Sequence, residues 1–219
     1  MCHRVMQRVS DIVEAGAIPM VFGGDHSIPY PIVRAISDHK QGNIGIINFD
    51  VHYDNSWGGR LTEGNQFARI FDTCQAEPEN MVLIGIKGGA YNTPNMHEVE
   101  EQVGFTIITI DDVEKLGIRE VTNCAMEVTA RNADRVYVSL DVDAIEPTNF
   151  PAQKYPDPFG LTTRQVREAI RILPKKVKIA GFDMVCIEPR YDDMGIDGLT
   201  ACRFYIEMLN ATEARKRLN

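Results

Sequence analysis

The stretch Ile44–Asp54 reads IGIINFDVHYD, a six-residue, mostly apolar run that ends in alternating acidic and imidazole side chains. A continuous apolar run of this length is typical of a strand that is buried on both faces in a parallel sheet. Because alternate residues of an extended chain share a face, Asp50, His52 and Asp54 can converge on one point. The stretch therefore predicts a buried parallel strand with polar side chains at its carboxyl end.

Two further runs end in the same way. Residues 21–27 read VFGGDHS and provide His26, and residues 138–143 read VSLDVD and provide Asp141 and Asp143. Carboxylates and imidazoles without a thiolate suit borderline-hard divalent ions such as Mn(II) better than structural zinc. Two such ions, roughly 3.5–4 Å apart, generate hydroxide from water at neutral pH. The three runs together predict a two-metal hydrolase site.

Apolar runs and helical patterns alternate along the rest of the chain. We expect strands at residues 18–22, 44–49, 81–86, 106–110, 135–140 and 177–185, and helices at 3–15, 29–38, 119–131, 163–173 and 199–209. Thr162 and Gln165 have the spacing of a capping box at the start of the 163–173 helix. The pattern predicts an α/β fold with three layers, α/β/α, and a mainly parallel sheet. Ligands of such sheets bind at the carboxyl ends of strands, and the long irregular stretches 55–65 and 144–161 are placed to wall that site.

Composition excludes several classes of function. A net charge of −8 over 219 residues argues against a nucleic-acid surface, and no apolar run approaches the 18 residues of a membrane span. The five cysteines are odd in number and form no Cys-x-x-Cys pair, as expected of reduced thiols in the cytoplasm. The length predicts one domain, residues 1–219.

With these motifs in this order, the chain resembles the ureohydrolases, the family of arginase, agmatinase and related amidinohydrolases. The family signatures read Gly-Gly-Asp-His-Ser at 23–27, Asp-x-His-x-Asp at 50–54 and Ser-x-Asp-x-Asp at 139–143, and the similarity extends from Ile18 to Leu209. Val51 and Glu146 depart from the usual alanine and aspartate. The resemblance implies an arginase-like sheet. Relatives usually have two more strands before the first signature, so the chain is either a truncated form or a minimal variant whose sheet edge a partner covers.

The resemblance also implies how the two ions are held. The expected ligands of one ion are His26, Asp50, Asp54 and Asp141. Those of the other are His52, Asp50, Asp141 and Asp143, so two aspartates bridge the pair. Mn(II) is the ion that the family implies, with Ni(II) as the alternative. Asp25, beside the ligand histidine, is expected to hold the turn or the outer layer of the site.

Three departures from the family bear on catalysis and substrate choice. Glu63 lies where relatives have a proton-transferring histidine, and a carboxylic acid does that work only if its pKa rises toward neutrality; the alternative is a solvated loop residue. Cys186 lies where relatives have a substrate-gripping glutamate, with Glu188 two residues on. Either Glu188 reaches the substrate, or the substrate is less basic; a nucleophilic Cys186 is disfavoured. Trp57 is either a substrate contact or a packing residue.

The reaction that these residues favour is agmatinase-like: a metal-bridging hydroxide cleaves a C–N bond of a guanidine or amidine and releases urea. The residues expected to act in catalysis are Asp54, Glu63 and Glu188, and those expected to bind substrate are Trp57, Cys186 and Glu188. The substrate implied is agmatine or a guanidino acid, with a smaller guanidine as the alternative. The family implies a homo-oligomer, a trimer or hexamer, or else a hetero-oligomer with a paralogue.

Two competing functions are weighed against this one. In the first, the chain is a degenerate, non-catalytic subunit that supports an active paralogue. The short N-terminus, Glu63 and Cys186 favour this hypothesis. Six intact ligands oppose it, because clustered carboxylates are costly to retain without a role. In the second, the chain is a hydrolase of the related deacetylase-type fold, but that fold does not explain the Asp-x-His-x-Asp ligands.

Overall fold

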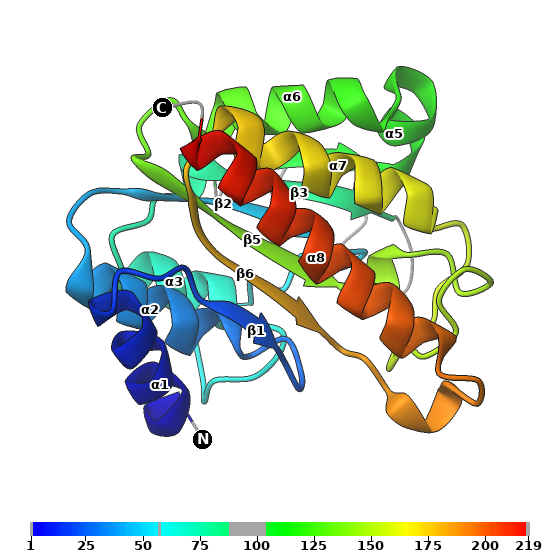
Figure 1. The fold of residues 1–219 in the computed structure, drawn as a ribbon, viewed down its shortest axis with the longest axis horizontal. Coiled ribbons are helices and arrows are strands. Elements are labelled where there is room, and N and C mark those ends of the chain that lie inside the picture. Colours follow the sequence, from blue (N-terminus) through cyan, green and yellow to red (C-terminus); the bar gives the residue numbers. More distant parts are fainter. Residues whose placement is uncertain (1, 57, 88–103, 218–219) are drawn as a thin grey trace.

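A computed structural model describes residues 2–56, 58–87 and 104–217. At its centre lies a six-stranded sheet in the order β1-β6-β5-β2-β3-β4, and every neighbouring pair of strands is parallel (Figure 1). The strands are β1 Met20–Phe22, β2 Ile44–Phe49, β3 Met81–Ile86, β4 Thr106–Thr109, β5 Arg135–Asp141 and β6 Ile179–Val185. All six lie where the sequence predicts strands.

Helices cover both faces of the sheet (Figure 1). On one face lie α1 Cys2–Glu14, α2 Pro29–His39 and α3 Gln66–Thr73. On the other lie α5 Ile110–Leu116, α6 Ile118–Thr129, α7 Thr163–Lys176 and α8 Ile196–Lys216. The predicted three-layer architecture is therefore confirmed. Within the described ranges, no helix is long and apolar enough to cross a membrane.

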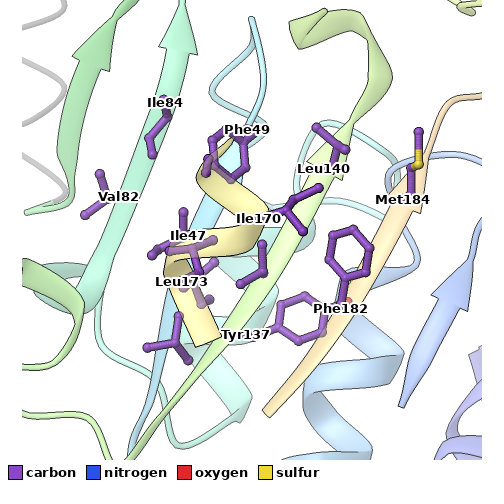
Figure 2. Packing of buried hydrophobic residues seen from close by; sticks show 14 of the residues in the cluster. Ile47, Phe49, Val82, Ile84, Tyr137, Leu140, Ile170, Leu173, Phe182 and Met184 are labelled. Carbon is purple, nitrogen blue, oxygen red and sulfur yellow. The ribbon is translucent and has the colours of Figure 1, made fainter. Parts of the chain in front are cut away.

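The core lies between the sheet and these helices. Every residue of β2 and β3 is buried, which explains why their sequences are continuous apolar runs. Figure 2 shows Ile170 and Leu173 of α7 packed over Ile47 and Tyr137 of the central strands. Burial of one such aliphatic side chain stabilises the fold by roughly 1.5–3 kcal/mol. The central strands are thereby fixed, and so are the residues at their ends.

Two helices were not predicted, and both have a local explanation. Helix α3 has only eight residues, too few for a clear helical period. Helix α5 follows β4 without a loop, because Thr109 and Asp112 form a capping box at the point where the sequence predicts that the strand continues. Helix α8 extends beyond the predicted 199–209 at both ends. The capping box of Thr162 and Gln165 is confirmed.

The chain order of the strands creates a crevice between β2 and β5. From β2 the chain continues to β3 and β4 at one edge, whereas β5 is followed by β6 on the other side. Such a reversal leaves a crevice at the carboxyl ends of the two central strands, where ligands of these sheets bind. Strand β1 forms one edge of the described sheet. The single domain 1–219 stays a prediction.

Candidate metal centre

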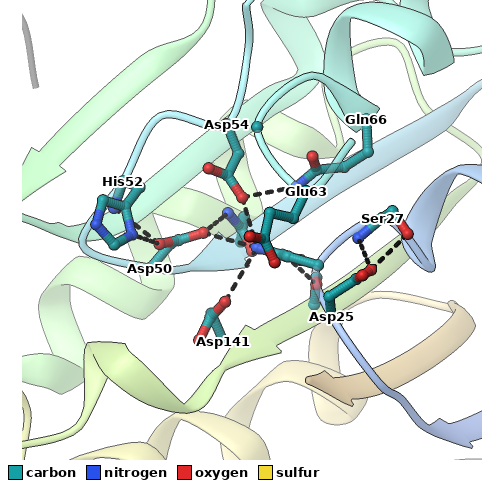
Figure 3. A network of polar contacts seen from close by, with 12 residues as sticks. Asp25, Ser27, Asp50, His52, Asp54, Glu63, Gln66 and Asp141 are labelled. Carbon is teal, nitrogen blue, oxygen red and sulfur yellow. Dashed lines mark hydrogen bonds and ion pairs between the residues drawn. The ribbon is translucent and has the colours of Figure 1, made fainter. Parts of the chain in front are cut away.

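The predicted ligands come from the ends of three strands. Asp50 directly follows β2, and Asp141 is the last residue of β5. Asp143 lies in the short 3-10 helix Val142–Ala144, and His26 in the loop after β1. Asp25 holds that loop: its Oδ1 accepts hydrogen bonds from the backbone N–H of Ser27 at 3.1 Å and from its hydroxyl at 2.5 Å (Figure 3). Its predicted turn-forming role is confirmed.

Three carboxylates surround the Nδ1 atom of His26. This atom lies 2.8 Å from Oδ2 of Asp54, 3.0 Å from Oδ2 of Asp50 and 3.2 Å from Oδ2 of Asp141. His26 is only 1% exposed. Burial lowers the pKa of the imidazole, but the hydrogen-bonded carboxylates outweigh burial and hold the pKa well above its usual value. The cluster is built to hold positive charge.

A second cluster lies beside the first. The Nδ1 atom of His52 lies 3.2 Å from Oδ2 of Asp143 and 3.4 Å from Oδ1 of Asp50. Burial alone would lower the pKa of His52, yet these two carboxylates raise it to about 11. Oδ2 of Asp143 faces His52, and its Oδ1 is buried without a hydrogen-bond partner among the described residues. A buried carboxylate oxygen of this kind fits a cation ligand.

Asp50 joins the two clusters. Its Oδ2 faces His26 and its Oδ1 faces His52, and the side chain is fully buried (Figure 3). Two groups of atoms with metal-ligand character share this aspartate: His26, Asp50 and Asp141 in one, and Asp50, His52 and Asp143 in the other. Asp141 turns Oδ2 to His26, while its Oδ1 accepts the backbone N–H of Asp143 at 3.0 Å. The geometry thus matches a bridge at Asp50, and a bridge at Asp141 stays a prediction.

Polar side chains outside the predicted set hold the ligands in place. Asn48 donates to Oδ2 of Asp50 at 3.1 Å, and Gln66 donates to Oδ2 of Asp54 at 2.8 Å. Asn48 lies two residues before Asp50, so the period of two could have found it. Gln66 belongs to the helix that was not predicted, and no local pattern marks it. Burial, together with the charge of Asp50, raises the pKa of Asp54 to about 6.

A cavity of about 240 Å³ opens over both clusters. Glu63, Tyr155 and Cys186 line it together with the candidate ligands. Glu63 comes from the stretch 55–65 and Tyr155 from 144–161, so the prediction that these stretches wall the site is confirmed at those residues. Trp57 lies outside the described residues.

The sequence model of the arginase family matches residues 1–210. This chain belongs to the arginase family. It is 33% identical to the mitochondrial agmatinase of Gallus gallus, over 95% of this chain and 61% of that protein. It is 32% identical to the mitochondrial guanidino acid hydrolase of Homo sapiens, over 96% of this chain and 59% of that protein. The chain thus spans about three fifths of the length of these relatives.

Solved structures of the family have the same fold. Proclavaminate amidino hydrolase from Streptomyces clavuligerus matches with a TM-score of 0.86 at 28% identity, over 98% of this chain and 70% of that one. Formimidoylglutamase from Bacillus subtilis matches with a TM-score of 0.87 over 96% of this chain and 66% of that one; at 24% identity, this likeness shows the fold alone. The resemblance drawn from the three motifs is confirmed.

In this arginase-family chain, Cys186 lies at the cavity and Glu188 does not. Cys186 is 4% exposed and adopts the left-handed φ of 63°. Burial and the nearby charge of Asp141 raise the pKa of its thiol far above the usual range, so the thiol is protonated and a poor nucleophile. Both carboxylate oxygens of Glu188 accept from the guanidinium of Arg190 at 2.9 Å. The structure does not bring Glu188 among the described residues that line the cavity.

Glu63 is occupied by two donors on the opposite wall. Lys154 Nζ donates to its Oε2 at 2.5 Å, and the Tyr155 hydroxyl donates to its Oε1 at 3.0 Å. The Tyr155 ring stands edge-on to His52, with 6.4 Å between ring centroids. The two irregular stretches are therefore tied to each other beside the candidate metal ligands.

Proposed function

We propose that this chain is a metal-dependent amidinohydrolase that cleaves a C–N bond of a guanidine or amidine. The observation that carries the proposal is the pair of imidazoles that face opposite oxygens of buried Asp50. A carboxylate between two histidines, each with further carboxylates around it, is the donor arrangement that a two-ion site requires.

Two divalent ions, Mn(II) or alternatively Ni(II), fit the donor set. His26, Asp54, Asp50 and Asp141 would hold one, and His52, Asp143 and the two bridging aspartates the other. When bound, such ions activate water at neutral pH and stabilise negative charge that develops on the substrate. The chain itself orients these donors: Asn48 and Gln66 donate to two of the carboxylates, and Asp141 is the last residue of β5.

Glu63 is the cavity-lining group placed to contact the leaving nitrogen. Lys154 and Tyr155 already donate to both of its oxygens, so its remaining lone pairs are acceptors. We therefore assign to Glu63 the orientation of a substrate N–H; the proton transfer that its sequence position suggests stays a prediction.

The substrate is a small guanidino or amidine compound, and the names of the relatives support that class. Cys186 lines the cavity with a protonated thiol, at the position where the family pattern has a glutamate. The cavity therefore binds a cationic substrate less strongly at this position. Agmatine or a guanidino acid is the substrate that the resemblance implies, and a small guanidine derivative is the alternative that Cys186 favours. Contact by Trp57 stays a prediction, and Glu188, which pairs with Arg190, is not assigned to the substrate.

The second candidate, a non-catalytic subunit that supports an active paralogue, has one observation in its favour. Apart from the candidate metal ligands, the only described carboxylate lining the cavity is Glu63, which is engaged by Lys154. The buried Oδ1 of Asp143, which has no hydrogen-bond partner among the described residues, counts against it, because such a group is costly without a cation.

One experiment separates the two candidates. The purified chain is reconstituted with Mn(II) or Ni(II), its metal content is measured by elemental analysis, and release of urea or ammonia is followed over a panel of guanidines and amidines. Two ions per chain with turnover of a panel member is the expected result. Two ions without any turnover would favour the subunit, and no bound metal would overturn the proposal.

A further inference from the structure

A buried carboxylate on β6, Asp183, has no place in the chemistry described so far. It is fully buried, and so are its partners Tyr137 and Ser139 on the neighbouring strand β5. Ser139 Oγ donates to Oδ1 of Asp183 at 2.8 Å, and the Tyr137 hydroxyl donates to Oδ2. Ser139 Oγ also lies 3.0 Å from Nε2 of His26. A chain of hydrogen bonds thus runs from the core to the candidate ligand.

The sheet itself fixes this arrangement. Ser139 and Asp183 are direct neighbours in the register of β5 and β6, and Tyr137 lies two residues before Ser139 on the same face of β5. Tyr137, Ser139 and Asp183 all belong to strands, so no loop residue is among these three. The position of Asp183 relative to the metal ligands is therefore as rigid as the central sheet.

Counting protons along the chain decides the direction of each bond. A carboxylate only accepts, so Ser139 gives its single proton to Asp183. Ser139 Oγ can then only accept from His26, which requires a proton on Nε2. The neutral imidazole has one proton, so Nδ1 keeps its lone pair. Nδ1 is the atom that faces Asp50, Asp54 and Asp141, the three carboxylates of the first candidate site.

We propose that Asp183 is a positioning residue that, through Ser139, fixes His26 as the tautomer whose Nδ1 can bind a cation. The proposal rests on the proposed metal-dependent function for its purpose, but the hydrogen-bond chain from Asp183 through Ser139 to His26 is a property of the chain alone. A fully buried carboxylate is costly unless donors satisfy it, and here two hydroxyls do so. Tyr137 holds the carboxylate in the orientation in which the other oxygen faces Ser139.

The decisive variant is Asp183→Asn, which keeps the shape of the side chain but replaces one acceptor oxygen with a donor N–H group. Tyr137 still needs the amide oxygen as acceptor, so the new amide N–H faces Ser139. Ser139 must then give its own proton to Nε2 of His26, and the imidazole proton moves to Nδ1. Outer residues that orient a ligand histidine typically change metal affinity by about 10–100-fold. We expect that loss at the first ion, with a smaller change at the ion held by His52.

Two measurements test this. Nitrogen-15 NMR of the histidine-labelled, metal-free chain at neutral pH reports whether Nε2 of His26, the nitrogen that faces Ser139, carries a proton. Competition with a chelator gives the affinity for each Mn(II). The matched control is Tyr137→Phe, which removes a hydrogen bond from the same carboxylate but leaves the Ser139 proton where it is.

The wild-type chain and Tyr137→Phe should show a proton on Nε2, and Asp183→Asn should show Nε2 without one. The same state of Nε2 in all three would overturn the proposal, as would a first-ion affinity of Asp183→Asn within about twofold of wild type. If the wild-type chain binds no Mn(II), the proposed function fails. The NMR result alone then decides the role of Asp183.

Discussion

At the scale of single residues, the chain shows how a strand ending in alternate polar side chains becomes a candidate metal site. Asp50 follows a fully buried strand, so its carboxylate is held in the protein interior, where only positive charge makes it tolerable. His26 and His52 supply that charge as imidazolium ions when no cation does, and burial alone would oppose them. The same field favours a divalent ion.

Replacement of Asp50 or Asp141 by Asn tests the bridges. A neutral amide is a poor bridge between two cations, so we expect bound metal to fall from about two per chain to one or none. Elemental analysis after gel filtration measures the content. Asp134→Asn is the control. Asp134 lies just before the amino end of β5, at the opposite end of the strand from Asp141, and accepts a hydrogen bond from the backbone N–H of Asn43. Two ions retained in both bridge variants would refute the site.

Substrate grip is tested at Cys186 and Glu188. Because Cys186 lines the cavity and Glu188 pairs with Arg190, we expect Cys186→Glu to raise kcat/KM for a guanidinium substrate. A charge-assisted hydrogen bond is worth about 1.5–3 kcal/mol, which corresponds to roughly 10–100-fold. Glu188→Gln should change kcat/KM by less than about twofold by the same scale. A large loss in Glu188→Gln with unchanged metal content would instead restore Glu188 as the substrate-binding residue.

At the scale of elements, the sequence predicts what depends on local pattern and fails where tertiary contacts decide. The six strands and the capping box at Thr162 follow from apolar runs and cap spacing. The pairing of Asp183 with Ser139 does not, because it depends on the register of two strands about forty residues apart, and no local pattern sets that register. Gln66 was missed for a different reason: its helix is too short to show a period.

The cap of α7 offers a test of stability. Thr162 accepts the backbone N–H of Gln165 at 3.2 Å, while Gln165 accepts the backbone N–H of Thr162 at 2.7 Å. Thr162→Ala should lower the free energy of unfolding by about 0.5–2 kcal/mol, as measured by urea denaturation. Thr163→Ala, one residue inside the helix, is the control and should cost less. Equal effects of the two variants would mean that the cap is not formed in solution.

At the scale of the whole molecule, the surface of α8 beside β1 is unusually apolar. Phe22, Leu199, Ile206 and Leu209 are 53%, 59%, 43% and 49% exposed, and Phe22 stacks on Tyr205 of α8. Exposed apolar groups beside a sheet edge are typical of surfaces that another chain covers. We therefore expect a homo-oligomer, in keeping with the trimer or hexamer that the family resemblance implies.

Light scattering at micromolar concentration measures this assembly. The double substitution Leu199→Glu and Ile206→Glu should shift the chain toward a monomer, since it buries charge in the contact. Arg203→Glu, also exposed on α8, is the control for a change of charge without loss of apolar surface. A wild-type monomer at this concentration would contradict the prediction.

Metal binding should also be visible as stability of the whole fold. The candidate ligands lie at the ends of β2 and β5 and in the loop after β1, so an ion that binds them stabilises the folded chain only. At a Mn(II) concentration a hundred times the Kd, one site contributes about 2.7 kcal/mol. Chelation should therefore lower Tm, and added Mn(II) should restore it. Asp50→Asn is the control that separates bound metal from a general effect of the salt, because its Tm should respond weakly. The same Tm for the wild-type chain with chelator and with Mn(II) would show that the carboxylates at the centre of this fold hold no cation.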